Sequence, residues 1–208
     1  MKRLWDVSPP VDAQAPVFPG DTAYRQARAA EIAPGCPVNV SAITMSPHVG
    51  AHADAPLHYD PQGVAVGLLG LEPYLGRCRV IHAIDVRPLI RVAHLEHALV
   101  DLPPRVLIRT YRRFPVDRFD DNLTAIDPAA VHELADRGVQ LIGLDSASLD
   151  PADSKVLPSH QAVRARGLRV LENLLLDDVP EGDYELIALP LKLMTADASP
   201  VRAVLREL

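Results

Sequence analysis

Twenty prolines spread over 208 residues constrain what this chain can fold into more than any other feature. Proline lacks a backbone N–H and fixes φ, so it interrupts helix interiors and central strands. The helices and strands between the prolines must therefore be short. Residues 7–22 carry four of the prolines, and we expect this segment to be irregular or extended.

Short apolar runs alternate with helical patterns between these prolines. Buried strands are predicted at residues 77–86, 105–111, 139–145 and 184–193, where Pro190 marks an edge or bulge, and a short one at 202–205. Residues 92–100 are predicted to be helical, and a second helix begins at Asp127-Pro128 and ends at Gly138. The alternation predicts one α/β domain over residues 1–208, with a mixed β-sheet and short helices.

The composition narrows the possible partners. A net charge of −6 argues against nucleic-acid binding, and we interpret the one basic cluster, Arg109–Arg118, as a solvated edge. No apolar run approaches the roughly 20 residues of a membrane helix, and the N-terminus has no apolar signal segment. Cys36 and Cys78 form no CxxC pair and suggest reduced thiols. We expect a soluble, cytoplasmic protein without a membrane or nucleic-acid partner.

Chemistry is concentrated in residues 48–58, which hold three of the eight histidines and one aspartate. Pro47, Gly50 and Pro56 argue against a helical zinc motif, so we predict an extended segment. Side chains then alternate between two faces. His48, His52, Asp54 and His58 share one face, and the opposite face is apolar and mostly small. Pro56 is expected to break the extended geometry before His58.

This pattern has two interpretations. The histidines could lie in a surface loop, or lie in the core with their hydrogen bonds satisfied. Three histidines on the same face as an aspartate favour a metal site instead, because burying unpaired polar groups is costly. Imidazole and carboxylate ligands suit zinc best, with manganese, iron or nickel as alternatives. One strand rarely completes a coordination sphere, so distant ligands are expected. The candidates are His160 and Glu172. The alternative for His160 is an exposed residue at the start of a helix, which Ser159 could cap. The alternative for Glu172 is an exposed position on a helix.

The segment from His48 to His58 resembles the HxGTHxDxPxH signature of the cyclase-like metal-dependent hydrolases, and within them the bacterial kynurenine formamidases (arylformamidases). The likeness covers nearly the whole chain. It includes residues 5–10, 18–21, 145–150, His160, residues 171–174, 189–193 and 199–202.

The resemblance implies a cyclase-like sandwich of the swivelling β/β/α type, usually a homodimer or larger, with two Zn²⁺ per subunit. By resemblance, His48, His52 and Asp54 bind one zinc, Asp54 and Glu172 bridge to a second, and His160 completes the second site. His58 is then the catalytic proton carrier, and Phe18 lies against a small-molecule substrate. The implied reaction is hydrolysis of N-formyl-L-kynurenine to L-kynurenine and formate, in tryptophan degradation.

Two residues depart from the pattern. Ala51 replaces the usual threonine of the signature. Because Ala51 is expected on the apolar face, the loss of the hydroxyl should affect the packing that supports the ligands and not metal binding itself. Phe18 stands where formamidases often have tryptophan, which keeps an aromatic face but removes the indole donor. Hydrolysis of another amide, an ester or an isatin-type cyclic amide therefore stays open, as does a non-enzymatic protein with a closed metal site.

Overall fold

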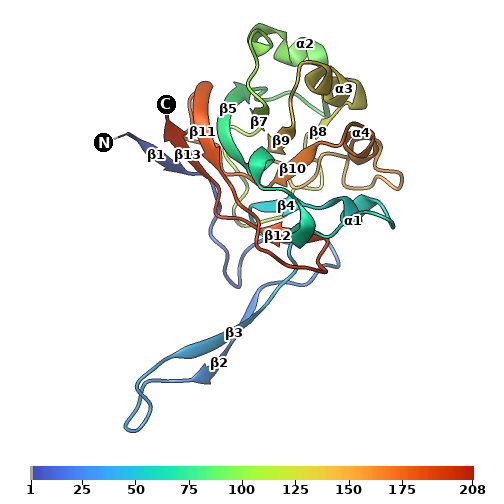
Figure 1. Ribbon diagram of the computed structural model, residues 1–208. Helices are drawn as coiled ribbons and strands as arrows, with labels where there is room; N and C mark the ends of the chain where they lie inside the picture. Colours follow the sequence, from blue (N-terminus) through green and yellow to red (C-terminus); the bar gives the residue numbers. More distant parts are fainter. Residues whose placement is uncertain (1) are drawn as a thin grey trace.

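The computed structural model describes residues 2–208, which fold around one nine-stranded sheet (Figure 1). The strand order is β1-β13-β11-β5-β7-β9-β10-β4-β12. Neighbouring strands from β5 to β10 run parallel, and the pairs on both flanks run antiparallel. The predicted α/β class and the mixed sheet are confirmed.

The nine strands are short, as the prolines predict. They are β1 (Leu4–Asp6), β4 (His52–Asp54), β5 (Leu75–His82), β7 (Arg105–Arg109), β9 (Leu141–Leu144), β10 (Arg169–Glu172), β11 (Gly182–Ile187), β12 (Ala198–Pro200) and β13 (Val204–Glu207). A two-stranded parallel sheet joins β6 (Leu89–Ile90) to β8 (Ala125–Ile126). A separate hairpin joins β2 (Arg25–Ala30) to β3 (Val40–Thr44).

The helices are short too, and the longer ones lie on one side of the sheet (Figure 1). They are α1 (Pro56–Tyr59), α2 (Val92–Leu95), α3 (Pro128–Asp136) and α4 (Pro158–Arg166), with 3-10 turns η1 (Val66–Leu68), η2 (Glu72–Tyr74) and η3 (Glu96–Ala98). Among residues 2–208, no helix has the length and apolar character needed to span a membrane.

Two hydrophobic cores lie on opposite faces of the sheet. Ile108 and Ile142 of the central strands pack on one face with Leu134 of α3 and Val163 of α4. On the other face, Leu107 and Leu141 pack with residues of the flanking strands, including Leu186 and Leu205. Alternate residues of one strand therefore serve both cores, which explains why the central strands are continuous apolar runs.

Helix α3 confirms the predicted start and stop signals. The Asp127 side chain accepts a hydrogen bond from the Ala129 N–H at 2.8 Å, and Pro128 occupies the first turn. Gly138 follows the helix with φ of +86°, a conformation that glycine adopts without steric cost. The predicted strands 77–86, 105–111 and 139–145 correspond to β5, β7 and β9, with ends that differ by a few residues.

Residues 92–98 are helical, as predicted for 92–100, although the helix is divided into the four-residue α2 and the 3-10 turn η3. Two other local predictions are wrong. The predicted strand 184–193 ends at Ile187, before Pro190, so the proline lies outside the sheet. Residues 48–58 are extended only from His52 to Asp54, because Gly50 turns the chain with φ of +68° and Pro56 begins the helical turn α1.

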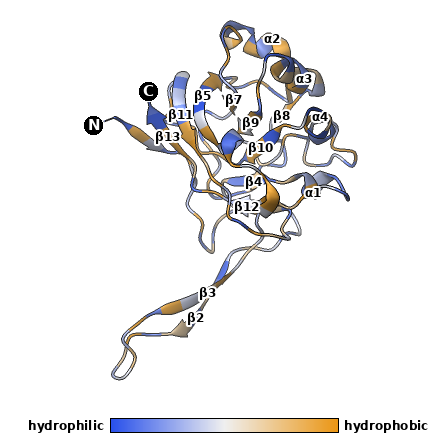
Figure 2. Cartoon of the chain, in the orientation of Figure 1, coloured by the Kyte–Doolittle hydropathy of each residue, from blue (hydrophilic) through white to orange (hydrophobic). Residues whose placement is uncertain are grey.

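The β2–β3 hairpin extends away from the body of the molecule, and nothing in the sequence predictions anticipated it (Figure 1). All five residues of β3 are exposed, among them Val40 and Ile43. Hydrophobic segments are visible along this exposed ribbon (Figure 2). An isolated two-stranded hairpin is marginally stable in water, so such an element normally depends on further contacts.

Candidate metal centre and adjoining cavity

The short strand β4 aims two of the predicted ligands at one buried point. Its side chains alternate, so His52 and Asp54 face the centre while Ala53 joins the apolar core behind the sheet. Ala51 lies in the same core, which confirms the expectation that this position is apolar and supporting. At Gly50, an added Cβ would lie 2.6 Å from Val11 Cγ2, so the turn that delivers His52 requires glycine.

Glu172 and His160 reach this point from other elements. Glu172 ends β10 and pairs in register with His52 of β4, so the two side chains lie next to each other on one face. Its 4% exposed fraction excludes the exposed helix position that the sequence left open. His160 lies in the first turn of α4 and is 2% exposed, which excludes the surface alternative.

Asp150 fixes the position of His160. Its carboxylate accepts hydrogen bonds from the backbone N–H groups of Ser159 and His160, at 2.8 and 3.0 Å, and so caps the first turn of α4. The same carboxylate lies 2.7 Å from His160 Nδ1, which turns Nε2 toward the centre. The predicted cap by Ser159 is wrong, because Ser159 Oγ donates to the Ile126 carbonyl instead.

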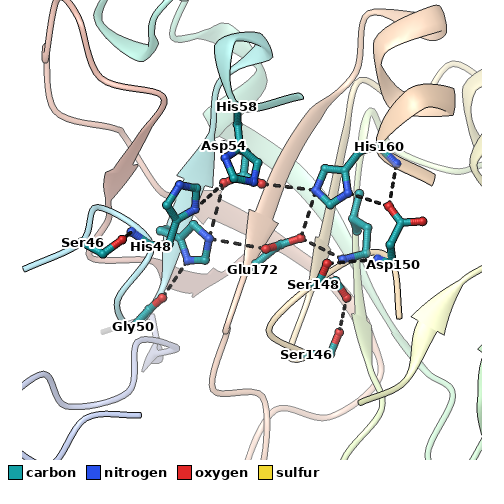
Figure 3. Close-up of polar contacts among 12 residues, drawn as sticks. Ser46, His48, Gly50, Asp54, His58, Ser146, Ser148, Asp150, His160 and Glu172 are labelled. Carbon is teal, nitrogen blue, oxygen red and sulfur yellow. Dashed lines mark hydrogen bonds and ion pairs between the residues drawn. The ribbon is translucent and has the colours of Figure 1, made fainter. Parts of the chain in front are cut away.

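Together these residues form two groups that share Asp54 (Figure 3). Asp54 Oδ1 lies 3.1 Å from His48 Nδ1 and 3.4 Å from His52 Nε2. Asp54 Oδ2 lies 3.4 Å from His160 Nε2. Glu172 is placed similarly, with Oε2 3.4 Å from His52 Nε2 and Oε1 3.5 Å from His160 Nε2. Each carboxylate thus directs one oxygen toward each group.

The centre has the chemistry of a cation site. His52 Nε2, His160 Nε2 and both Asp54 oxygens are buried without a hydrogen-bond partner among the described residues. Burial opposes protonation of His52, yet the Asp54 and Glu172 carboxylates raise its pKa to about 10. Two buried carboxylates therefore demand positive charge at this point. Divalent metal ions bound by imidazole nitrogen and carboxylate oxygen would supply it, so the residues present fit a metal centre.

His58 lies at the edge of this centre and not within it. It is carried by the helical turn α1, with its ring centroid 4.3 Å from that of His48. Its Nδ1 lies 3.2 Å from Asp197 Oδ2, and the same oxygen lies 3.0 Å from His48 Nε2. His48, His58 and Asp197 are close enough to hold an ion themselves, so geometry alone allows His58 to be a ligand or a proton carrier.

Asp197 was missed by the sequence predictions. It is an isolated carboxylate in a segment that shows no hydrophobic periodicity. Only the fold brings it beside His58 and His48, which lie 139 and 149 positions earlier in the chain. The Asp197 backbone carbonyl also accepts the Ala55 N–H at 2.8 Å, which holds this segment against the end of β4.

A cavity of about 460 Å³ opens beside the metal centre. Its walls combine His48, His52, His58, His160 and Glu172 with four aromatic side chains, Phe18, Tyr111, Phe114 and Phe119. Phe18 is 44% exposed, which excludes ordinary core packing, and meets Phe119 edge to face with ring centroids 5.2 Å apart. The centre is therefore open on one side to a space with aromatic walls.

The cavity corrects the interpretation of the basic cluster. Arg112 and Arg113 are exposed, as a solvated edge requires, but Phe114 and Arg118 line the cavity. Sequence gave no signal for this, because a loop shows no periodicity that reports which way its side chains face.

The sequence of this chain matches the Cyclase family model over residues 5–151. The chain belongs to the Cyclase family. The matched range contains β4, α1 and the cavity loop from Tyr111 to Phe119, so the family assignment covers most of the site, although His160 and Glu172 lie beyond it. The resemblance inferred from the His48–His58 signature is confirmed.

Known proteins are similar to this chain over almost their whole length. The kynurenine formamidase of Delftia acidovorans is 66% identical, with 100% of this chain and 99% of that protein covered. The kynurenine formamidase of Paracidovorax citrulli is 65% identical, with 99% and 97% covered. The solved structure of a predicted metal-dependent hydrolase from Bacillus stearothermophilus is 27% identical with a TM-score of 0.84 and covers 100% of both chains. The cyclase-like fold is thereby confirmed.

Proposed function

We propose that this chain is a metal-dependent formamidase that hydrolyses N-formyl-L-kynurenine to L-kynurenine and formate, a step of tryptophan degradation. The observation that carries the proposal is the full-length identity of 66% to a kynurenine formamidase, in a chain whose buried ligand groups open on an aromatic cavity. That name favours this reaction over hydrolysis of another amide, an ester or an isatin-type ring.

The proposed cofactor is two Zn²⁺ per chain. His48, His52 and Asp54 would hold one ion, His160 would complete the site of the other, and Asp54 and Glu172 would bridge them. The bridging roles are supported by the direction of the carboxylates, each with one oxygen toward either group. Zinc held by these residues would lower the pKa of a bound water to about 7 and would polarise the formyl oxygen.

The protein's own groups would carry out the remaining steps. Hydrolysis must expel an arylamine nitrogen, which is a poor leaving group until it is protonated. We assign this transfer to His58, at the border between the centre and the cavity: it would take a proton from the attacking water and give it to the nitrogen as the C–N bond breaks. Asp197 accepts the Nδ1 proton of His58, which fixes the ring and leaves Nε2 to serve the substrate. Asp150 keeps His160 directed at the centre.

Incubation of the purified protein with N-formyl-L-kynurenine tests the reaction itself. Kynurenine and formate should appear in equal amounts, because one amide bond is cleaved by one water molecule. Formate should be absent when N-acetyl-L-kynurenine replaces the substrate, since the released acid is then acetate. If the zinc-loaded protein releases neither kynurenine nor formate from N-formyl-L-kynurenine, the proposed function is wrong.

Phe18 is proposed to hold the aryl ring of the substrate. Phe18→Ala removes an aromatic contact of about 0.5–1.5 kcal/mol beyond area burial. We expect KM for N-formyl-L-kynurenine to rise by roughly three- to ten-fold, with little change in kcat, because ring stacking is similar in ground and transition states. Steady-state kinetics with N-formyl-L-kynurenine and with formamide itself would measure this. Equal losses for both, or a large drop in Tm, would assign Phe18 a structural role.

We also propose that two copies of the chain associate in the cytoplasm. The exposed β2–β3 hairpin supports association, because its apolar side chains, including Ile32 at 63% and Ile43 at 58% exposure, have no cover within the described residues. The two free thiols, Cys36 and Cys78, are compatible with a reducing compartment. Light scattering should give twice the chain mass of 22.6 kDa, and Ile43→Asp should lower it. A wild-type protein of single-chain mass would contradict the dimer.

A further inference from the structure

The cavity holds one cationic side chain that the proposed reaction has not used. Among residues 2–208, Arg118 is the one lysine or arginine in the cavity wall. It directly precedes Phe119, whose ring packs against Phe18, so the guanidinium and the aromatic pair belong to the same stretch of wall. A cation beside an aromatic surface is an arrangement suited to a ligand with a ring and a negative group.

The carboxylates nearby are mostly engaged with other partners. Asp145 accepts hydrogen bonds from the backbone N–H groups of Thr110 and Tyr111, at 2.9 and 3.0 Å. Asp120 accepts the Tyr111 hydroxyl at 3.0 Å and pairs with Arg87 at 3.2 Å. Neither forms an ion pair with Arg118. Asp21, which also lines the cavity, accepts the Thr22 N–H at 2.6 Å and is likewise not paired with Arg118 among the described residues.

Arg118 itself has only a weak partner. Its guanidinium lies 3.8 Å from Asp117 Oδ1, and the two side chains are 75% and 77% exposed. Exposed pairs at such distances contribute little, so the five N–H donors of the guanidinium remain available. Arg112 and Arg113 do not line the cavity: Arg112 pairs with Asp85, and Arg113 lies 3.8 Å from Asp177 Oδ2.

We propose that Arg118 binds the α-carboxylate of the amino-acid side chain of the substrate. The inference rests on the proposed function, since N-formyl-L-kynurenine carries this carboxylate at the end of the chain next to its formamide group. A planar guanidinium matches a carboxylate with two parallel hydrogen bonds. Arg118 is thus a specificity-determining residue, which selects amino-acid formanilides over formanilides without a charged chain.

The test compares two substrates that share the aryl formamide. One is N-formyl-L-kynurenine, and the other is N-(2-acetylphenyl)formamide, which lacks the amino-acid group. Arg118→Ala should raise KM for N-formyl-L-kynurenine by about ten-fold, as expected for a charged hydrogen bond weakened by solvent. Its kcat, and both parameters for N-(2-acetylphenyl)formamide, should stay near the wild-type values. Arg118→Lys should recover part of the affinity, because it keeps the charge without the planar fork.

Arg113→Ala is the matched control, because Arg113 lies in the same loop, is 85% exposed and is absent from the cavity wall. Arg113→Ala should leave KM and kcat for both substrates at the wild-type values. Added salt should raise the KM of the wild type for N-formyl-L-kynurenine and leave that of Arg118→Ala nearly constant.

The outcomes separate this inference from the function on which it rests. Wild-type protein that hydrolyses neither substrate would remove the proposed function. If the wild-type protein hydrolyses both substrates, the proposed function stands. If Arg118→Ala then changes KM equally for the two substrates, or for neither, the proposed role of Arg118 is wrong. Because Arg118 is exposed, its variant should keep the wild-type Tm, so a loss of affinity reports on binding.

Discussion

His58→Ala should lower kcat for N-formyl-L-kynurenine by about 10²–10⁴-fold, the usual contribution of a general acid. The reason is the leaving group, which departs as an amine only if it receives a proton. His58 is one-third exposed at the border of the cavity and is held by Asp197. Metal content should stay at the wild-type level, because both ligand groups that share Asp54 are complete without His58.

Elemental analysis and steady-state kinetics on the same preparation would measure both quantities. A substrate with a better leaving group, such as a formate ester of a phenol, should be much less affected by the substitution. Loss of an ion from His58→Ala would instead make His58 a ligand together with His48 and Asp197, as their spacing allows, and the assigned proton transfer would be wrong.

Asp54→Asn should impair both metal binding and catalysis, because Asp54 belongs to both ligand groups. The amide keeps the shape of the side chain but removes the negative charge and one acceptor oxygen. We expect fewer than two ions per chain and a loss in kcat/KM of about 10³-fold or more, since both the bound water and the polarised carbonyl depend on the metal.

Asp60→Asn is a suitable comparison, because Asp60 forms an ion pair with Arg164 at 2.7 Å and is absent from both ligand groups. It should retain metal and activity. An Asp54→Asn protein with two ions and near-wild-type kinetics would show that Asp54 neither bridges nor binds.

The sequence predicted the chemistry of the site better than its geometry. His52 and Asp54 were correctly placed on one face, because alternation holds over the three residues of β4. Alternation could not place His48 or His58, which are delivered by the turn at Gly50 and by α1. A spacing of two residues places side chains on one face only within a strand. The chain leaves the extended conformation on both sides of β4, before it reaches His48 and His58.

From the residues alone, the long-range partners of β4 could be named only as candidates or not at all. Glu172 and His160 lie more than a hundred residues from β4 and reach it through the sheet register and the cap of α4. Asp197, Arg118 and Phe119 carry no local signal, since loop residues have no periodicity. The fold class was predictable because the buried parallel strands leave continuous apolar runs, whereas the exposed β2–β3 hairpin has no buried face to reveal it.

Formamide hydrolysis should require two metal ions in the ligand groups that share Asp54. To test this requirement, the protein is stripped with a chelator, zinc is returned in measured amounts, and hydrolysis of N-formyl-L-kynurenine is followed. We predict negligible activity in the stripped protein and a linear or lagging recovery that reaches its plateau at two zinc ions per chain. Full activity in the stripped protein, or a plateau at one ion, would contradict the account.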